Sequence, residues 1–212
     1  MTFEGMSDDN RRRLMIVTTI SLGMFIIEAL AGQLAGSQSL KADALDFVAH
    51  GLTYALAFWA IGRPMPARLA AAIVKAGSLV AMGLWVAATT LYHFFVPAPP
   101  DAGIMAFIGL VALGANAITL GTLFAQRGDG STIGSVWLEA RDDTIGNAAV
   151  LVAAGLVAIL GNCAPDLIVA GVMAALFLTS AFQMLRQTLQ AWRELKEADA
   201  FPHREHSPPP DA

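Results

Sequence analysis

The strongest constraint on the fold is a series of six long apolar runs, separated by short breaks rich in Gly, Pro, Asn, Asp and Ser. The runs cover residues 14–34, 40–61, 69–96, 104–124, 133–160 and 167–185. Each is close to the roughly 20 residues that a helix needs to cross the hydrocarbon core of a bilayer. The chain as a whole is 56% hydrophobic and only 14% charged. This pattern predicts an all-α integral membrane bundle of six transmembrane helices.

Basic residues predict the orientation of the bundle, because Lys and Arg near the ends of spans are retained in the cytoplasm. With the N-terminus inside, Lys41 is the one basic residue expected near the outer face. An even number of spans then leaves both termini cytoplasmic. The residues expected on the inner side are Arg11, Arg12, Arg13, Arg63, Arg68, Lys75, Arg127, Arg186, Arg193, Lys196 and Arg204.

Three segments are expected along the 212 residues. Residues 1–13 form a cytoplasmic N-terminal segment, and residues 14–185 form the six-helix transmembrane domain. Residues 186–212 begin as a helical extension with an apolar stripe from Leu185 to Leu195, since Leu and Trp recur there at helical spacing. The charged, Pro-rich end after Pro202 is expected to be disordered.

Composition also argues against several classes of function. The net charge of −4 does not favour a nucleic-acid binder, which would present a basic face. Cys163 is the single cysteine, so no intramolecular disulfide or thiolate cluster is expected. An intramembrane metallohydrolase would need a motif such as H-E-x-x-H, which the sequence lacks. We therefore expect neither an enzyme nor a prosthetic group.

Ionisable side chains lie inside the predicted spans, and this is the feature that points to function. Each costs about 2.5 to 3.5 kcal/mol on insertion scales, so such residues are rare unless they line a polar pathway or pair with one another. They are concentrated in the first, second and fifth spans. These residues are Glu28, Asp43, Asp46, His50, Glu139, Arg141, Asp142 and Asp143.

Their spacing predicts a metal site between the second and fifth spans. Asp46 and His50 are four positions apart, as are Glu139 and Asp143, so each pair shares one helix face. A rise of about 1.5 Å per residue puts both pairs near mid-bilayer. One imidazole and three carboxylates suit zinc, iron, cobalt or manganese. A hydrogen-bonded network that only fixes helix packing is the alternative.

The second span also carries a recognisable motif, Ser37-Gln-Ser-Leu-Lys-Ala-Asp43-Ala-Leu-Asp46-Phe-Val-Ala-His50. It resembles the signature of the cation diffusion facilitator family, which exports divalent metals against protons. The resemblance covers residues 14 to about 185. Asp46 and His50 occupy the ligand positions of the second helix, where the family has an acid in place of His50.

The other matched positions lie on the first and fifth helices. Glu139 and Asp143 match the fifth-helix ligand pair, with Glu139 in place of the expected His. Asn147 matches the small polar residue that follows the pair, and Glu28 matches the acidic position of the first helix. Asp43 and Glu28 are interpreted as second-shell or pathway groups, and Asn147 is assigned with them.

The resemblance implies a short form of the family without its C-terminal cytoplasmic domain. It implies metal/proton antiport by alternating access, with zinc the first candidate cargo, then iron, cobalt, manganese and cadmium. The expected partners are the metal ion, protons, lipid and a second copy in a homodimer, in a bacterial inner membrane. The alternative function is a non-transporting scaffold or metal-binding accessory subunit.

Overall fold

A computed structural model describes residues 8–60, 63–124 and 132–200, and these residues fold into six α-helices. They are α1 (Asp8–Ala35), α2 (Gln38–Ala60), α3 (Met65–Phe95), α4 (Ala102–Leu123), α5 (Thr132–Leu160) and α6 (Ala164–Ala200). The described residues include no β-strand. The all-α prediction is therefore confirmed.

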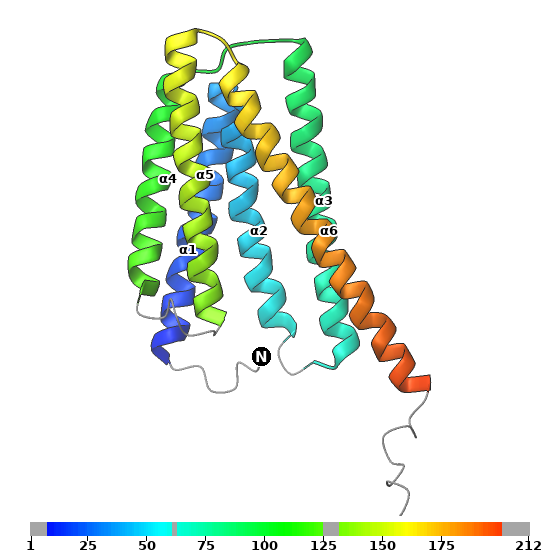
Figure 1. Cartoon of the computed structure of the whole chain (residues 1–212). Helices are drawn as coiled ribbons and strands as arrows, with labels where there is room; N and C mark the ends of the chain where they lie inside the picture. The colour runs from blue at the N-terminus through cyan, green and yellow to red at the C-terminus, as the bar shows by residue number, and fades with distance from the viewer. Residues whose placement is uncertain (1–7, 61–62, 125–131, 201–212) are drawn as a thin grey trace, which may run out of the picture.

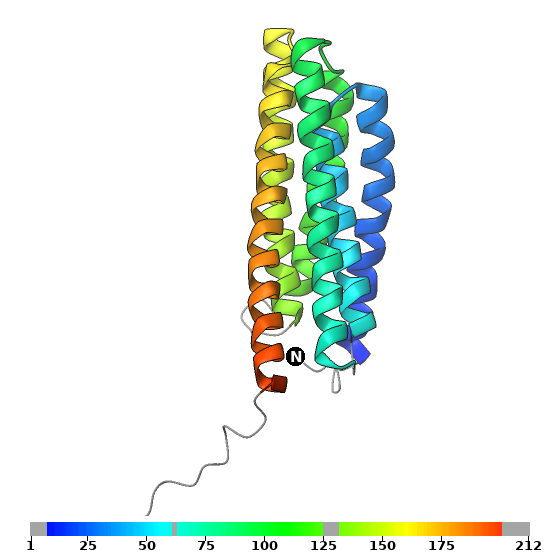
Figure 2. The ribbon, with the colours of Figure 1, turned by 90° about the vertical axis from the view of Figure 1, so that its right-hand side faces the viewer.

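Successive helices run in opposite directions along one bundle axis (Figure 1). Helix α1 begins and helix α6 ends at the same end of the bundle, which Figures 1 and 2 both place at the bottom. The connections α1–α2, α3–α4 and α5–α6 lie at the opposite end. Two of these turns use a glycine with positive φ, Gly36 at 68° and Gly161 at 65°, a conformation that other residues rarely adopt.

Five of the helices are long and apolar enough to cross a membrane, and α2 is the exception. Helix α2 carries Lys41, Asp43, Asp46 and His50, which lower its hydropathy. It nevertheless lies inside the bundle, where it contacts α1, α3, α5 and α6 (Figure 1). Its neighbours, rather than its own composition, shield the polar residues of α2 from lipid.

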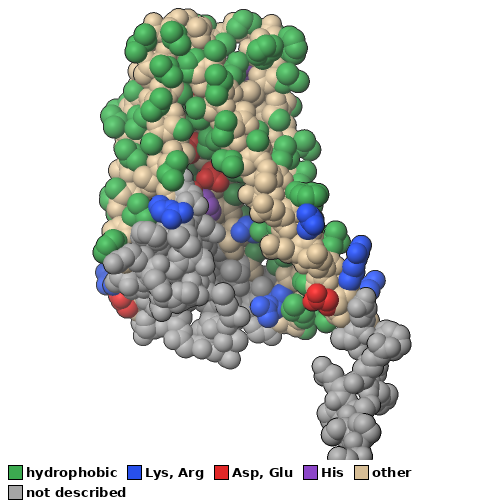
Figure 3. Space-filling view, in the orientation of Figure 1, with side chains coloured by type: hydrophobic (Ala, Val, Ile, Leu, Met, Phe, Trp, Pro, Cys, Tyr) green, Lys and Arg blue, Asp and Glu red, His purple; other side chains and the backbone are tan. Residues whose placement is uncertain are grey.

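The surface of the bundle is apolar over most of its length, unlike the polar surface of a soluble protein. Large apolar side chains face outward, among them Leu34 at 79% exposure, Phe95 at 73% and Ile159 at 80%. Basic side chains gather toward the lower end in the view of Figure 3, whereas apolar ones cover the upper part. This arrangement suits a molecule whose outer solvent is lipid.

The helices divide into a pair, α3 and α6, and a group formed by α1, α2, α4 and α5. The most extensive contacts join α3 to α6, α4 to α5, and α1 to α2. In Figure 1, α6 is inclined to α5 and diverges from it toward the lower end. Helix α6 therefore lies closer to α5 at the upper end than at the lower end.

Close packing of α3 against α6 depends on Gly83. A Cβ atom at this position would lie 2.8 Å from Cγ of Leu178 and 3.2 Å from Cβ of Phe177. Small residues allow membrane helices to approach in this way.

We expect Gly83→Ala to destabilise the protein by about 1 to 3 kcal/mol, the usual range for overpacking a close contact. Thermal unfolding in detergent measures the effect. Gly77→Ala on the same helix is the matched control, because a Cβ there meets nothing within 4 Å. Equal melting temperatures for the two variants would contradict the close α3–α6 contact.

Candidate metal centre

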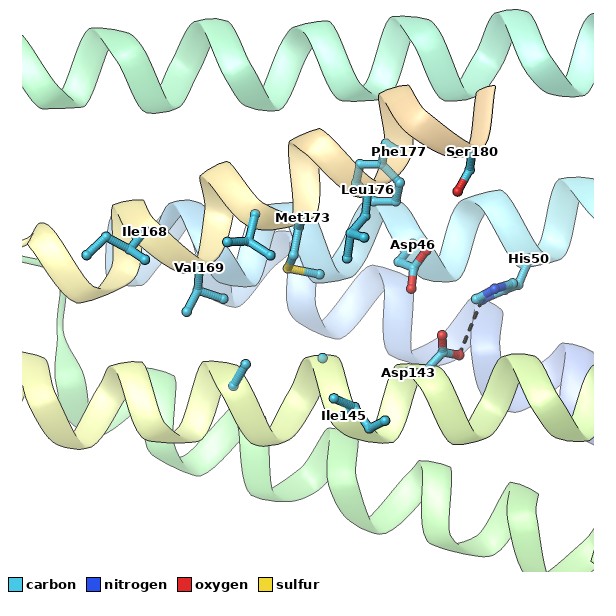
Figure 4. A pocket seen from close by; sticks show the side chains of 13 residues that line it. Asp46, His50, Asp143, Ile145, Ile168, Val169, Met173, Leu176, Phe177 and Ser180 are labelled. Carbon is cyan, nitrogen blue, oxygen red and sulfur yellow. Dashed lines mark ion pairs between the residues drawn. The ribbon is translucent and has the colours of Figure 1, made fainter. Parts of the chain in front are cut away.

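Helices α2 and α5 bring three potential metal ligands together. Asp46 and His50 lie one turn apart on α2, and Asp143 faces them from α5 (Figure 4). One ligand atom from each residue lies within 4.8 Å of the other two. His50 Nδ1 is 3.3 Å from Asp143 Oδ2. Among the described residues, this is the group of His, Cys, Asp and Glu side chains with metal-binding spacing.

The group lies in the wall of a cavity of about 590 Å³ between α2, α5 and α6. The side chains of His50 and Asp143 are 15% and 13% exposed. Apart from the ligand group, the lining is mostly apolar, with Met173 and Phe177 on α6. The three polar side chains thus face a cavity that an ion could enter and whose lining includes the exposed side chains of Ile168 and Leu176.

The other predicted site residues fall in two places. Glu139 lies on α5, one turn before Asp143, but its side chain is outside the described residues, so its position as a ligand stays a prediction. Asn147 lies one turn after Asp143 and is fully buried. Neither polar atom of its amide has a hydrogen-bond partner among the described residues.

Glu28 and Asp43 form a second polar group beside the first. Glu28 is 0% exposed and Asp43 is 2% exposed. Glu28 lies within electrostatic range of both Asp43 and Asp46, and neither of its carboxylate oxygens has a hydrogen-bond partner among the described residues. Asp43 approaches α5 as well, since its Oδ1 lies 3.8 Å from a Cβ built on Gly146. A buried carboxylate needs a proton, a cation or several donors, so this pair adds to the demand for positive charge near the three ligands.

Sequence reasoning missed the contribution of α6 to the site. Met173, Phe177 and Ser180 line the cavity opposite Asp46 and His50 (Figure 4). The sixth span carries no ionisable group at this depth that would have drawn attention to it. The i, i+4 and i+7 spacing of Met173, Phe177 and Ser180 is a usable signal only once the facing helix is known.

Two helix boundaries also differ from those expected. The apolar runs begin at residues 40 and 167, but α2 begins at Gln38 and α6 at Ala164. A cap from α6 accounts for the early start of α2. Asp166 accepts hydrogen bonds from the backbone N–H groups of Gln38 and Ser39, at 2.7 and 3.0 Å, which lets α2 start early.

The arrangement suits a borderline divalent cation. One imidazole nitrogen and two carboxylates are three of the four ligands of a tetrahedral zinc site, and the fourth position is open to Glu139 or water. Magnesium, which prefers oxygen ligands in an octahedral arrangement, fits less well.

Comparison with known families bears on this site directly. The model of the family described as "Cation efflux transmembrane domain" matches residues 14–191. The chain belongs to this family. The resemblance to cation diffusion facilitators, first suggested by the motif from Ser37 to His50, is thereby confirmed, and so is the membrane character of the cation efflux domain.

Curated relatives include bacterial zinc transporters. The chain is 26% identical to zinc transporter ZitB of Escherichia coli (strain K12) over 195 residues, which cover 86% of this chain and 62% of that protein. Identity to zinc transporter ZitB of Yersinia pestis is 25% over 194 residues, with 85% and 62% covered. This cation efflux domain thus spans less than two thirds of the length of the relatives it matches.

Removing a ligand should weaken metal binding in detergent. We expect His50→Ala and Asp143→Ala each to raise the dissociation constant for zinc at least about tenfold, which corresponds to about 1.4 kcal/mol. Isothermal titration calorimetry measures this change. Asp101→Ala is the control, because Asp101 is exposed and only caps α4 through the N–H of Ile104. Unchanged zinc affinity in both site variants would rule out these residues as ligands.

Proposed function

We propose that this cation efflux domain moves a divalent metal cation, with zinc as the first candidate, out of the cytoplasm. The observation that carries the proposal is the convergence of Asp46, His50 and Asp143 within 4.8 Å at the wall of a cavity between α2, α5 and α6 in a bundle of apolar helices. The family match and the zinc transporters among the relatives support it.

The fourth ligand in this proposal is Glu139. Its position one turn from Asp143 on α5 supports the assignment, because residues four apart share a helix face. The zinc ion would then be held by one imidazole and three carboxylates. Iron, cobalt, manganese and cadmium are the further candidate cargoes, since this ligand set does not exclude them.

Protons are the proposed counter-ion. Metal ligands must be deprotonated to bind, so binding releases protons and protonation releases metal. Histidine is the side chain best suited to this exchange near neutral pH, which makes His50 the first candidate to carry a proton back. Glu28, Asp43 and Asn147 are the proposed pathway groups, since all three are buried beside the ligands.

Alternating access is the proposed mechanism. The divergence of α6 from α5 at the end that carries most basic residues supports a cavity directed toward that side (Figures 1 and 3). By the positive-inside rule this end faces the cytoplasm of a bacterial cell. A homodimer through the α6 surface near Leu189, which is 53% exposed, is part of the same proposal.

Flux measurements test this function. We expect zinc uptake into proteoliposomes to depend on an imposed proton gradient and to be lost in Asp143→Ala, because that variant removes the α5 ligand nearest His50. Asp101→Ala should transport normally. The other four candidate cations are assayed in parallel to rank the cargo.

Absence of flux for every cation, from protein with the native melting temperature, would contradict the transporter proposal. Zinc binding without flux would instead favour a metal-binding accessory subunit. Flux that does not depend on the proton gradient would support metal transport but contradict metal/proton antiport.

A further inference from the structure

At the end of the bundle opposite the diverging end of α6, a buried carboxylate joins α6 to α2. Asp166, in the first turn of α6, is 1% exposed. It accepts four hydrogen bonds, all from the segment that opens α2. The donors are Ser37 Oγ at 2.6 Å, the Gln38 N–H at 2.7 Å, the Ser39 N–H at 3.0 Å and Ser39 Oγ at 2.6 Å.

Each of these four hydrogen bonds is expected to be strong, because hydrogen bonds to an ionised acceptor are about twice as strong as neutral ones. Two of the donors are backbone N–H groups at the N-terminus of α2, where the helix dipole favours a negative charge. Ser37 in turn accepts from the N–H of Leu40 at 3.1 Å, so the same residue caps α2 and contacts α6.

Asp166 joins the α3–α6 pair to the group of α1, α2, α4 and α5. It belongs to α6, whereas Ser37, Gln38 and Ser39 open α2. At the opposite end α6 diverges from α5 (Figure 1). The contact between Asp166 and residues 37–39, here termed the latch, is therefore placed to close one side while the other is open.

An apolar layer lies directly beneath the latch. Val169 follows Asp166 by three positions, on the same face of α6. It packs against a buried cluster that includes Leu40 of α2 and Val150 of α5. Val169 also lines the upper part of the cavity that contains Asp46, His50 and Asp143 (Figure 4). The metal cavity thus extends to within about one helical turn, 5.4 Å, of the latch.

We propose that the latch is the outer gate of this transporter, and that Asp166 must leave Ser37, Gln38 and Ser39 before the metal site can open to the outside. The cavity reaches Ile168 and Val169, which follow Asp166 on α6 by two and three positions. Breaking it would let α6 move away from α2 and connect the cavity to the outer face. This inference rests on the proposed transport function, but its test does not require flux.

The labelling rate of a cysteine at position 169 reports whether the gate is open. Cells that express the Cys163→Ala, Val169→Cys protein are treated with a membrane-impermeant maleimide, which reaches only the outer face. With the latch intact we expect slow labelling from outside and faster labelling in inside-out vesicles. Asp166→Asn and Ser39→Ala should each raise the outside rate at least about tenfold, the effect of losing one charge-assisted hydrogen bond from the closed state.

The controls separate gating from unfolding and from an error in orientation. Asp101→Asn removes a capping acid at the same end of the bundle without touching the latch, and should leave the labelling rate unchanged. Native Cys163, partly exposed at that end, should be labelled from outside in the unmodified protein. Ser39→Ala removes one hydrogen bond and keeps the acid, so it carries the test if Asp166→Asn fails to insert.

Each outcome decides the proposal. Faster outside labelling in the two latch variants, with Asp101→Asn unchanged, supports the gate even if no metal flux is found. Outside rates equal to those of the unmodified latch would overturn it, whatever the transport result. Equal acceleration in Asp101→Asn would also overturn it, because the effect would then reflect general loosening of that end.

Discussion

The rest of the structure depends on one constraint: a buried ionisable side chain needs an opposite charge or hydrogen-bond donors around it. Asp46, His50 and Asp143 converge at one wall of a cavity, and Glu28 and Asp43 are fully enclosed beside them. Such groups are tolerated inside a membrane only with partners. This requirement explains why α2, which carries Asp43, Asp46 and His50, occupies the interior, and why four other helices contact it. A divalent cation is the partner that would satisfy most of these carboxylates at once.

A second buried carboxylate meets the same requirement in a different way. Asp166 is surrounded by four hydrogen-bond donors, and this contact joins two helices rather than holding an ion. The two solutions lie at different levels of the bundle. Metal ligands lie where α6 diverges from α5, and the donor-rich contact lies where α6 meets α2. A transporter needs both kinds of site, one that exchanges its cation and one that holds a conformation until it is released.

Much of this could be predicted from the sequence. The six apolar runs gave the helices, and the four-residue spacing of Asp46 and His50 placed both on the face that meets Asp143. Periodicity describes one helix at a time, so it could not reveal which face of α6 lines the cavity or that Met173 and Ser180 lie opposite the ligands. It also missed the role of Asp166, because its long-range contact with residues 37–39 caps the start of α2. An acid at the beginning of one span and a Ser-Gln-Ser segment at the beginning of another are complementary only after the fold brings them together.

The most direct test of the central claim is zinc K-edge X-ray absorption of the zinc-loaded protein. The account predicts a first shell of nitrogen and oxygen only, near 2.0 to 2.1 Å, with one imidazole that disappears in His50→Ala. A sulfur scatterer near 2.3 Å, which would come from Cys163 or a methionine, would contradict it. So would an imidazole signal that persists in His50→Ala, since zinc would then be bound elsewhere than between α2 and α5.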